Sequence, residues 1–503
     1  MPVTTSQRPH GATQPRSVSP PRDGRYAHAV EGAVAGLCAV LAMVVVSALA
    51  LTLLDAGSVG SVAALTAAVA ALAVGGSLTA GPDASGATES SGSGLAGLFG
   101  GGGGMSPAMN GSADVVPLGV TLVGAVVLWL LFSRRLRHQR FDAGELAVRA
   151  AGTGAAALFA LMILAALAKG TITLPASVTN RGESGGGAGG GGLAGGGGML
   201  GRLLGGGGGA ASEPTLAYHA SVGSAAFGAL LWVAVVLGVG CVVSRRVRVP
   251  LGGAVDRFRS GWAPALGAVV RMILIVGVVA LLVVGFVGLM AGGRGATAAG
   301  AALLVAPNAV AAFLSLGVGA PWTESTEQVK SDGGNPLAGL MSTLGGGQRP
   351  VEPDRHEQLR AVSVAGWPLW LIALVVTGLA LVVCAYTATR NADPRHMRPL
   401  HPYRGPLAAH VGLAERFGLV TAAVFGVACV LAEASGRFGA SMFGSEMGGT
   451  RARFDGSLPM TLAGGLIAGF VAGMAGSLLY RAMTSGPRIL PRKPPLEVPV
   501  DLR

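Results

Sequence analysis

The chain has 503 residues, of which 51% are hydrophobic and 12% charged, and its mean hydropathy is +0.60. This balance excludes an ordinary soluble globular protein and favours a chain embedded in lipid. The formal net charge is +12, but the basic residues cluster at the ends of apolar segments. Such clusters are typical of cytoplasmic loops and of contact with anionic lipids. Nucleic-acid binding is not expected, because the sequence lacks a basic face with interleaved aromatic residues. All four cysteines lie in apolar segments without the spacing of a metal site.

The first apolar segment covers residues 29–54. A hydrocarbon core of roughly 30 Å needs about 20 apolar residues in a helix, which also satisfies its own backbone hydrogen bonds. Residues 1–28 are rich in Pro, Ser and Arg and are predicted to be a disordered cytoplasmic tail. A cleaved signal peptide is the alternative, because Ser47–Ala50 resembles a cleavage site. The long tail and the long apolar run favour a retained membrane span.

Further apolar segments follow in chain order. The clear spans are 115–132, 150–167, 221–243, 272–290, 367–385, 417–432 and 458–480. Two Ala-rich segments, 58–79 and 296–320, are only marginally hydrophobic and are interrupted by Gly75-Gly76 and Pro307-Asn308. Glycine-rich or polar loops lie between the spans, at 81–114, 181–212, 321–361 and 434–457, and residues 482–503 form a Pro-rich basic tail.

The two halves of the chain, 29–250 and 251–481, present these segments in the same order. Leu146–Arg149 aligns with Leu413–Arg416, and Ala67–Ala71 aligns with Asn308–Ala312. Single matches in Ala/Gly-rich sequence carry little weight, but their common order predicts an internal duplication.

Charge clusters then predict the topology. The basic clusters at 133–140, 245–259, 390–404 and 481–493 occupy equivalent places in both halves, and the positive-inside rule puts them all in the cytoplasm. Each half then has an even number of crossings, so the marginal segments are expected to be re-entrant or short helices. The loops at 81–114, 181–212, 321–361 and 434–457 are then expected to be flexible and to lie on the outer side of the membrane. The predicted fold is an all-α integral membrane protein. It is a duplicated bundle of about eight full transmembrane helices plus two marginal Ala-rich helices, in the plasma membrane, with both termini cytoplasmic. Ten full crossings, with an inverted second half, are the alternative.

Ionisable residues inside a membrane are the usual functional signal, and few are present here. Arg149, Arg271 and Arg416 each precede a charge-free run and are predicted to anchor the cytoplasmic interface. A buried ion pair or a gating role is the alternative for them. Gly465, Gly469 and Gly473 form a stripe that lets helices approach closely, either within this chain or in a homo-oligomer.

The sequence offers no catalytic residue, cofactor motif or metal-ligand spacing, so an enzyme is the least favoured class. Two functional hypotheses remain. The first is a non-enzymatic structural or interaction protein of the cell envelope, which fits the scarcity of buried polar groups. The second is a channel or secondary transporter with a pathway between the two halves, lined by polar or helix-breaking residues of the marginal segments. Those residues are Asn308, Pro307, Ser77 and Thr66.

Three segments resemble the streptophobe family, a group of polytopic membrane proteins of actinomycetes. They are Leu65–Thr79 (LTAAVAALAVGGSLT), Val115–Leu128 (VVPLGVTLVGAVVL) and Ala306–Trp322 (APNAVAAFLSLGVGAPW). The resemblance implies a membrane location and a lineage. It implies no activity, cofactor or catalytic residue, because none is established for the family. The long glycine runs of this chain depart from the family pattern.

Overall fold

The computed structural model describes residues 22–82, 108–136, 143–173, 215–243, 253–290, 294–329, 355–364, 366–392, 407–442 and 445–484. The helices are α1 (Arg22–Leu53), α2 (Val62–Leu72), α4 (Leu118–Leu136), α5 (Ala143–Leu167), α8 (Val222–Val243), α9 (Gly253–Met290), α10 (Arg294–Gly317), α12 (Leu369–Asn391), α13 (Ala408–Ala432) and α14 (Leu458–Thr484). The strands are β1 (Leu78–Pro82), β2 (Ala108–Val115), β3 (Lys169–Thr173), β4 (Thr215–Ala220), β5 (Trp322–Val329), β6 (Arg355–Gln358), β7 (Ser363–Val364), β8 (Trp367–Pro368), β9 (Ala434–Met442) and β10 (Ser445–Gly456).

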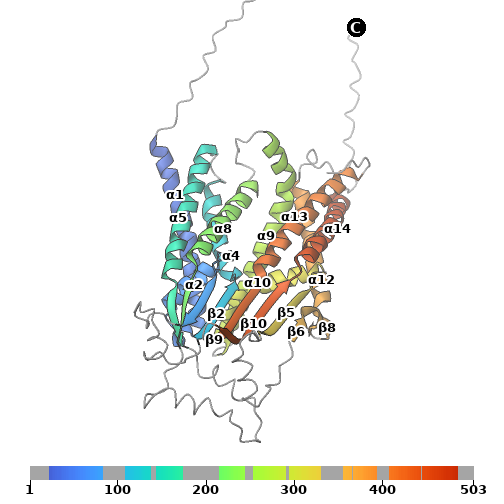
Figure 1. Ribbon diagram of the computed structural model, residues 1–503. Coiled ribbons are helices and arrows are strands. Elements are labelled where there is room, and N and C mark those ends of the chain that lie inside the picture. The colour runs from blue at the N-terminus through green and yellow to red at the C-terminus, as the bar shows by residue number, and fades with distance from the viewer. Residues whose placement is uncertain are drawn as a thin grey trace, which may run out of the picture.

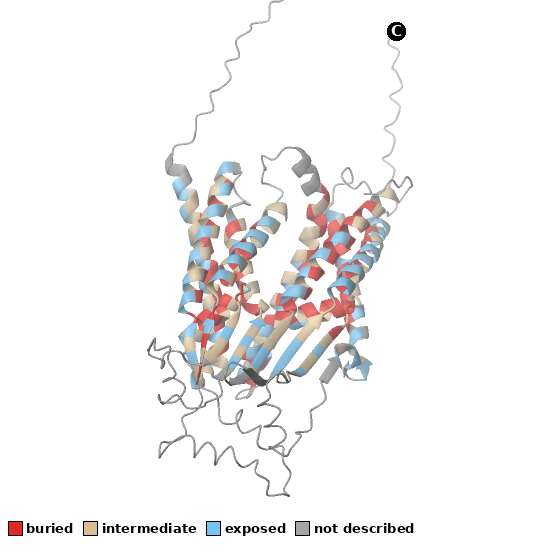
Figure 2. Ribbon diagram, viewed as in Figure 1, coloured by how far each residue is buried: buried red, intermediate tan, exposed pale blue. Residues whose placement is uncertain are grey.

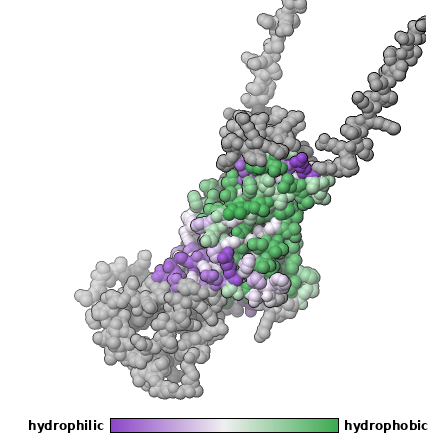
Figure 3. Space-filling view, turned by 90° about the vertical axis from the view of Figure 1, so that its right-hand side faces the viewer, coloured by the Kyte–Doolittle hydropathy of each residue, from purple (hydrophilic) through white to green (hydrophobic). Residues whose placement is uncertain are grey.

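The helices form a membrane bundle. Within the described ranges, eight helices are long and apolar enough to cross a bilayer: α1, α5, α8, α9, α10, α12, α13 and α14. Many large apolar side chains on them are exposed, and they form the hydrophobic band of the surface in Figure 3. Contact of such an apolar band with lipid has no free-energy cost, whereas its exposure to water would be unfavourable. The prediction of a multi-pass helical membrane protein is confirmed.

The helices run in two directions between a far face and the face that carries the strands (Figure 1). α5 and α13 start at the far face, since each leads directly into a strand of the sheet, and α1 and α9 pack alongside them in the same direction. α4, α8, α12 and α14 follow strands and return to the far face. α4 has 19 residues, which rise about 28 Å in a helix and so match the hydrocarbon core.

The two marginal segments, α2 and α10, stay on the strand side of the bundle. α2 has 11 residues, which rise about 16 Å and cannot span the core. α10 has 24 residues, but its Gly300 lies against Ala50 and Leu54 at the end of α1, and its Gly317 lies against Ala373 near the start of α12. α10 therefore lies across the ends of other helices and begins and ends on one side, despite its length.

An antiparallel eight-stranded sheet closes this side, in the order β3-β4-β1-β2-β9-β10-β5-β6. β2 and β9 join the two halves over the register Ala108↔Ser441 to Val115↔Ala434. β7 and β8 form a separate two-stranded pair. The sheet was not expected from the sequence. Most of its strands lie within or next to the predicted external loops, whereas β3 directly follows α5. Figure 2 shows the buried residues inside the bundle and near the sheet.

Corresponding contacts recur in the two halves. A left-handed glycine follows the end of each marginal helix: Gly75 (φ 89°) after α2 and Gly319 (φ 96°) after α10. A Cβ at Gly228 of α8 would overlap the carbonyl of Val74, and a Cβ at Gly464 of α14 would overlap that of Val318. The backbone of Ser221 donates to Ser77, and that of Ser457 donates to Pro321. In each half, the marginal helix (α2 or α10) therefore packs on the last helix (α8 or α14) in the same way.

Two details differ from the sequence analysis. Residues 22–28, placed in the disordered tail, belong to α1. When the two halves are aligned on the turns after α2 and α10, Ala71 corresponds to Ser315. The alignment of the sequence alone matches Ala71 to Ala312, because alanine runs match at several offsets. Most of the predicted loops 81–114 and 181–212, and most of both tails, lie outside the described residues.

The glycine stripe of α14 allows a direct test of packing. A Cβ at Gly469 would lie 2.8 Å from the Cα of Gly418 in α13, so Gly469→Ala is expected to destabilise the protein by about 1–3 kcal/mol through overpacking. Gly378→Ala in α12 is the control, because nothing lies within 4 Å of a Cβ there. Thermal unfolding in detergent measures both. Equal melting temperatures for the two variants would contradict the observed helix contact.

Candidate functional site

Asn308 lies where α10 crosses the start of α4, and 5% of it is exposed. Its Nδ2 donates to the carbonyl of Val116 at 2.8 Å, and its Oδ1 accepts from the backbone N–H of Leu118 at 3.0 Å. Leu118 is the first residue of α4, so Asn308 satisfies a helix N–H that lacks a partner within its own helix. The side chain thus holds two segments 190 positions apart instead of facing a passage.

Pro307 lies at the same crossing and breaks one backbone hydrogen bond of α10. A proline has no N–H, so the carbonyl of Leu303, four residues earlier, lacks its usual helical donor. That carbonyl lies against Gly119 of α4, where a Cβ would overlap it. The proline and the glycine together let the two backbones meet.

The other two predicted pathway residues also bond within the fold. The Thr66 hydroxyl donates to the Val62 carbonyl of its own helix. The Ser77 backbone N–H donates to the Ser224 hydroxyl of α8 at 3.2 Å. Neither of the two cavities described below is lined by Asn308, Pro307, Ser77 or Thr66.

Trp322 is the most important residue that the sequence analysis did not single out. It is fully buried at the start of β5, its Nε1 donates to the Ser315 hydroxyl of α10 at 2.8 Å, and its ring stacks on Phe454 of β10 at 4.8 Å between centroids. It therefore ties the sheet to α10. A tryptophan directly after a marginal helix was the available signal.

The three predicted interface arginines occupy different environments. Arg149 is 4% exposed, its Nη2 donates to the Leu131 carbonyl at 3.4 Å, and its guanidinium lies 5.2 Å from the Phe132 ring. Arg416 is 8% exposed and packs near Gly261 of α9. Both lie inside the protein and do not face lipid. Arg271 is exposed, and its role as an anchor at the cytoplasmic interface remains a prediction.

The predicted glycine stripe packs within this chain. Positions 465, 469 and 473 of α14 lie against the Cα atoms of Ala422, Gly418 and Ala414 of α13. Close backbone approach of this kind drives helix association in lipid. The stripe is thus occupied by a neighbouring helix of the same molecule.

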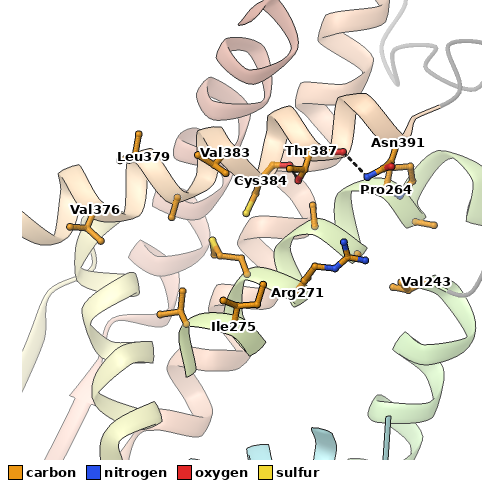
Figure 4. A pocket seen from close by; sticks show the side chains of 16 residues that line it. Val243, Pro264, Arg271, Ile275, Val376, Leu379, Val383, Cys384, Thr387 and Asn391 are labelled. Atoms are coloured by element: carbon orange, nitrogen blue, oxygen red, sulfur yellow. Dashed lines mark hydrogen bonds between the residues drawn. The ribbon is translucent and has the colours of Figure 1, made fainter. Parts of the chain in front are cut away.

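A groove of about 810 Å³ lies between the end of α8 and the facing sides of α9 and α12 (Figure 4). Arg271 points into it from α9, and Thr387 and Asn391 of α12 lie toward the same end. The remaining lining is mostly aliphatic. The groove is thus an apolar trough with one polar, cationic end.

A second cavity, of about 520 Å³, lies at the β2–β9 junction between the two halves. It is lined by Asp114, Glu433, Arg453 and Asp455 among others. Burial raises the pKa of the Glu433 carboxyl, Asp455 raises it further, and Arg453 partly opposes them. The surroundings of Glu433 therefore disfavour its ionised form, relative to a carboxyl in water, on the sheet side of the bundle.

Glu433→Gln tests this electrostatic arrangement. A raised pKa in the folded state means that folding favours the proton, so wild-type stability falls as pH rises through the ordinary carboxyl pKa to the raised one. The glutamine variant avoids that loss and is expected to melt above the wild type at neutral pH. The gain should vanish at pH values below the ordinary carboxyl pKa. A difference that does not change with pH, in melting curves across a pH series, would contradict the assignment.

Among the residues that the structure describes, no three His, Cys, Asp or Glu side chains are grouped to hold a metal ion. The described sites thus offer a cation at Arg271 that can bind an anion, and a carboxyl at Glu433 whose pKa is raised by burial and by Asp455. Comparison with known proteins adds no relative, since no family model, no curated protein and no solved structure matches this chain.

Proposed function

We propose that this multi-pass membrane protein is a non-enzymatic component of the cell envelope that presents its eight-stranded sheet to an envelope partner. One observation carries the proposal: polar groups of the two marginal segments, 58–79 and 296–320, are used inside the fold. Asn308 bonds to the start of α4, and Ser77 bonds to Ser224. A transport pathway would need such groups to face a shared polar cavity at membrane depth.

We further propose that the protein resides in the plasma membrane with the sheet outside. The support is the charge at the far ends of the returning helices. Arg134 lies near the end of α4, Arg390 lies in the last turn of α12, and Arg481 lies in the last turn of α14. Basic residues at short loops and helix ends favour the cytoplasmic side.

We also propose that the chain arose by internal duplication and that it belongs to the streptophobe family. The recurring contacts of Gly228 with Val74 and of Gly464 with Val318 support an internal duplication. The strand orders β3-β4-β1-β2 and β9-β10-β5-β6 support it independently, since the second repeats the first. Membership of the streptophobe family rests on the sequence segments alone.

Asn308→Ala separates the structural role from transport. The variant leaves the Leu118 N–H and the Val116 carbonyl without this partner, which is expected to cost about 1–3 kcal/mol. Thr52→Ala is the control, because that exposed hydroxyl bonds only to Leu49 of its own helix. Proteoliposomes loaded with Na⁺, K⁺ or pH indicators should show the flux of empty vesicles for wild type and for both variants. A wild-type flux that Asn308→Ala abolishes without lowering the melting temperature would favour a transporter.

Thiol labelling of intact cells tests the orientation. In a background without the four native cysteines, Ser112→Cys on β2 and Thr484→Cys at the end of α14 place exposed thiols on opposite faces. A membrane-impermeant reagent is expected to label the first in intact cells and the second only after permeabilisation. The reverse pattern would invert the proposed topology.

A further inference from the structure

The groove between α8, α9 and α12 exists because small side chains line part of it. Ala263, Gly267 and Ala268 of α9 face α8 and α12, where larger residues would fill the space. Gly267 permits close approach to α8, since a Cβ there would lie 3.3 Å from the Val243 side chain. Pro264 lies in the same turn and removes one helical N–H. The result is an indentation in the face that the helices turn toward lipid.

The groove has an apolar part and a polar end. Ile275 of α9 and Val376, Leu379 and Val383 of α12 line the apolar part, and three of these four are more than half exposed. Arg271, Thr387 and Asn391 lie toward the far face of the bundle, where α12 ends. Figure 4 shows the Arg271 guanidinium between α9, Val243 and the end of α12.

Arg271 is the one charged side chain among the described residues that line the groove. No aspartate or glutamate is among its described lining residues, so Arg271 gives the groove a positive charge. A cation within a membrane-spanning helix is costly unless it reaches an anion or the headgroup region. A phosphate satisfies an arginine through paired hydrogen bonds, and acyl chains match the aliphatic lining. The volume lies within the range of about 300–1,000 Å³ that is usual for small-molecule sites.

We propose that this groove binds one anionic glycerophospholipid from the leaflet remote from the sheet. The headgroup phosphate contacts the Arg271 guanidinium, and the polar side chains of Thr387 and Asn391 flank the headgroup. The acyl chains lie along Val376, Leu379 and Val383 of α12 and Ile275 of α9. The site is independent of the proposed function and of the orientation of the protein.

Native mass spectrometry of the full-length protein, purified in detergent micelles doped with phosphatidylglycerol or phosphatidylcholine, tests the proposal. The wild type is expected to retain one phosphatidylglycerol and to prefer it over phosphatidylcholine. Arg271→Gln should lower the retention of phosphatidylglycerol about tenfold, which corresponds to roughly 1.4 kcal/mol. Arg134→Gln is the matched control, because it removes an exposed arginine from the same side of the bundle but outside the groove.

A second variant keeps the test decisive if Arg271→Gln does not fold. Thr387→Glu places a carboxylate at the polar end of the groove and is expected to abolish the preference for phosphatidylglycerol while leaving the melting temperature unchanged. The proposal is overturned if the wild type retains both lipids equally. It is also overturned if Arg271→Gln, or in its absence Thr387→Glu, retains phosphatidylglycerol as well as Arg134→Gln does.

Discussion

The placement of α10 across the strand-side ends of the bundle is the constraint on which the rest of the structure depends. The four crossing helices of the first half share one apolar core, and those of the second half share another. α10 contacts α1 and α4 of the first half and α12 and α13 of the second. Asn308 fixes this crossing, because one amide side chain satisfies both a carbonyl and a helix N–H of the other half. Deep in the protein such paired hydrogen bonds are stronger than in water.

Close backbone approach at glycines recurs across the helix contacts of both halves. Lipid tails are as apolar as leucine, so helices in a membrane gain little from hydrophobic burial and depend on van der Waals contact. Glycine supplies that contact here, at Gly119 against Leu303, at Gly228 against Val74 and at Gly469 against Gly418. The abundant small residues of the spans are therefore part of the fold. Some of the segments that look least hydrophobic are the most tightly enclosed.

The three arginines near the far face show how the same residue type takes different roles. Arg149 is buried, and its guanidinium contacts the Phe132 ring and the Leu131 carbonyl within the first half. Arg271 lies on the outer side of α9 and gives its charge to an open groove. Their sequence contexts are alike, since each stands before a long apolar run. Burial separates them, and burial depends on which helix lies opposite.

The sequence by itself determined the helical membrane bundle, because hydrophobic length is a local property that a window of residues carries. Its charge clusters also predicted that residues 58–79 and 296–320 do not cross, and both α2 and α10 begin and end on the strand side. Only the tertiary structure decided the sheet, since β2 pairs with β9 more than 300 positions away and glycine-rich strands have no distinctive pattern. It also decided that Asn308 is a structural link and that Arg271, alone of the three arginines, faces a groove. Both outcomes depend on contacts between distant segments, which local composition does not encode.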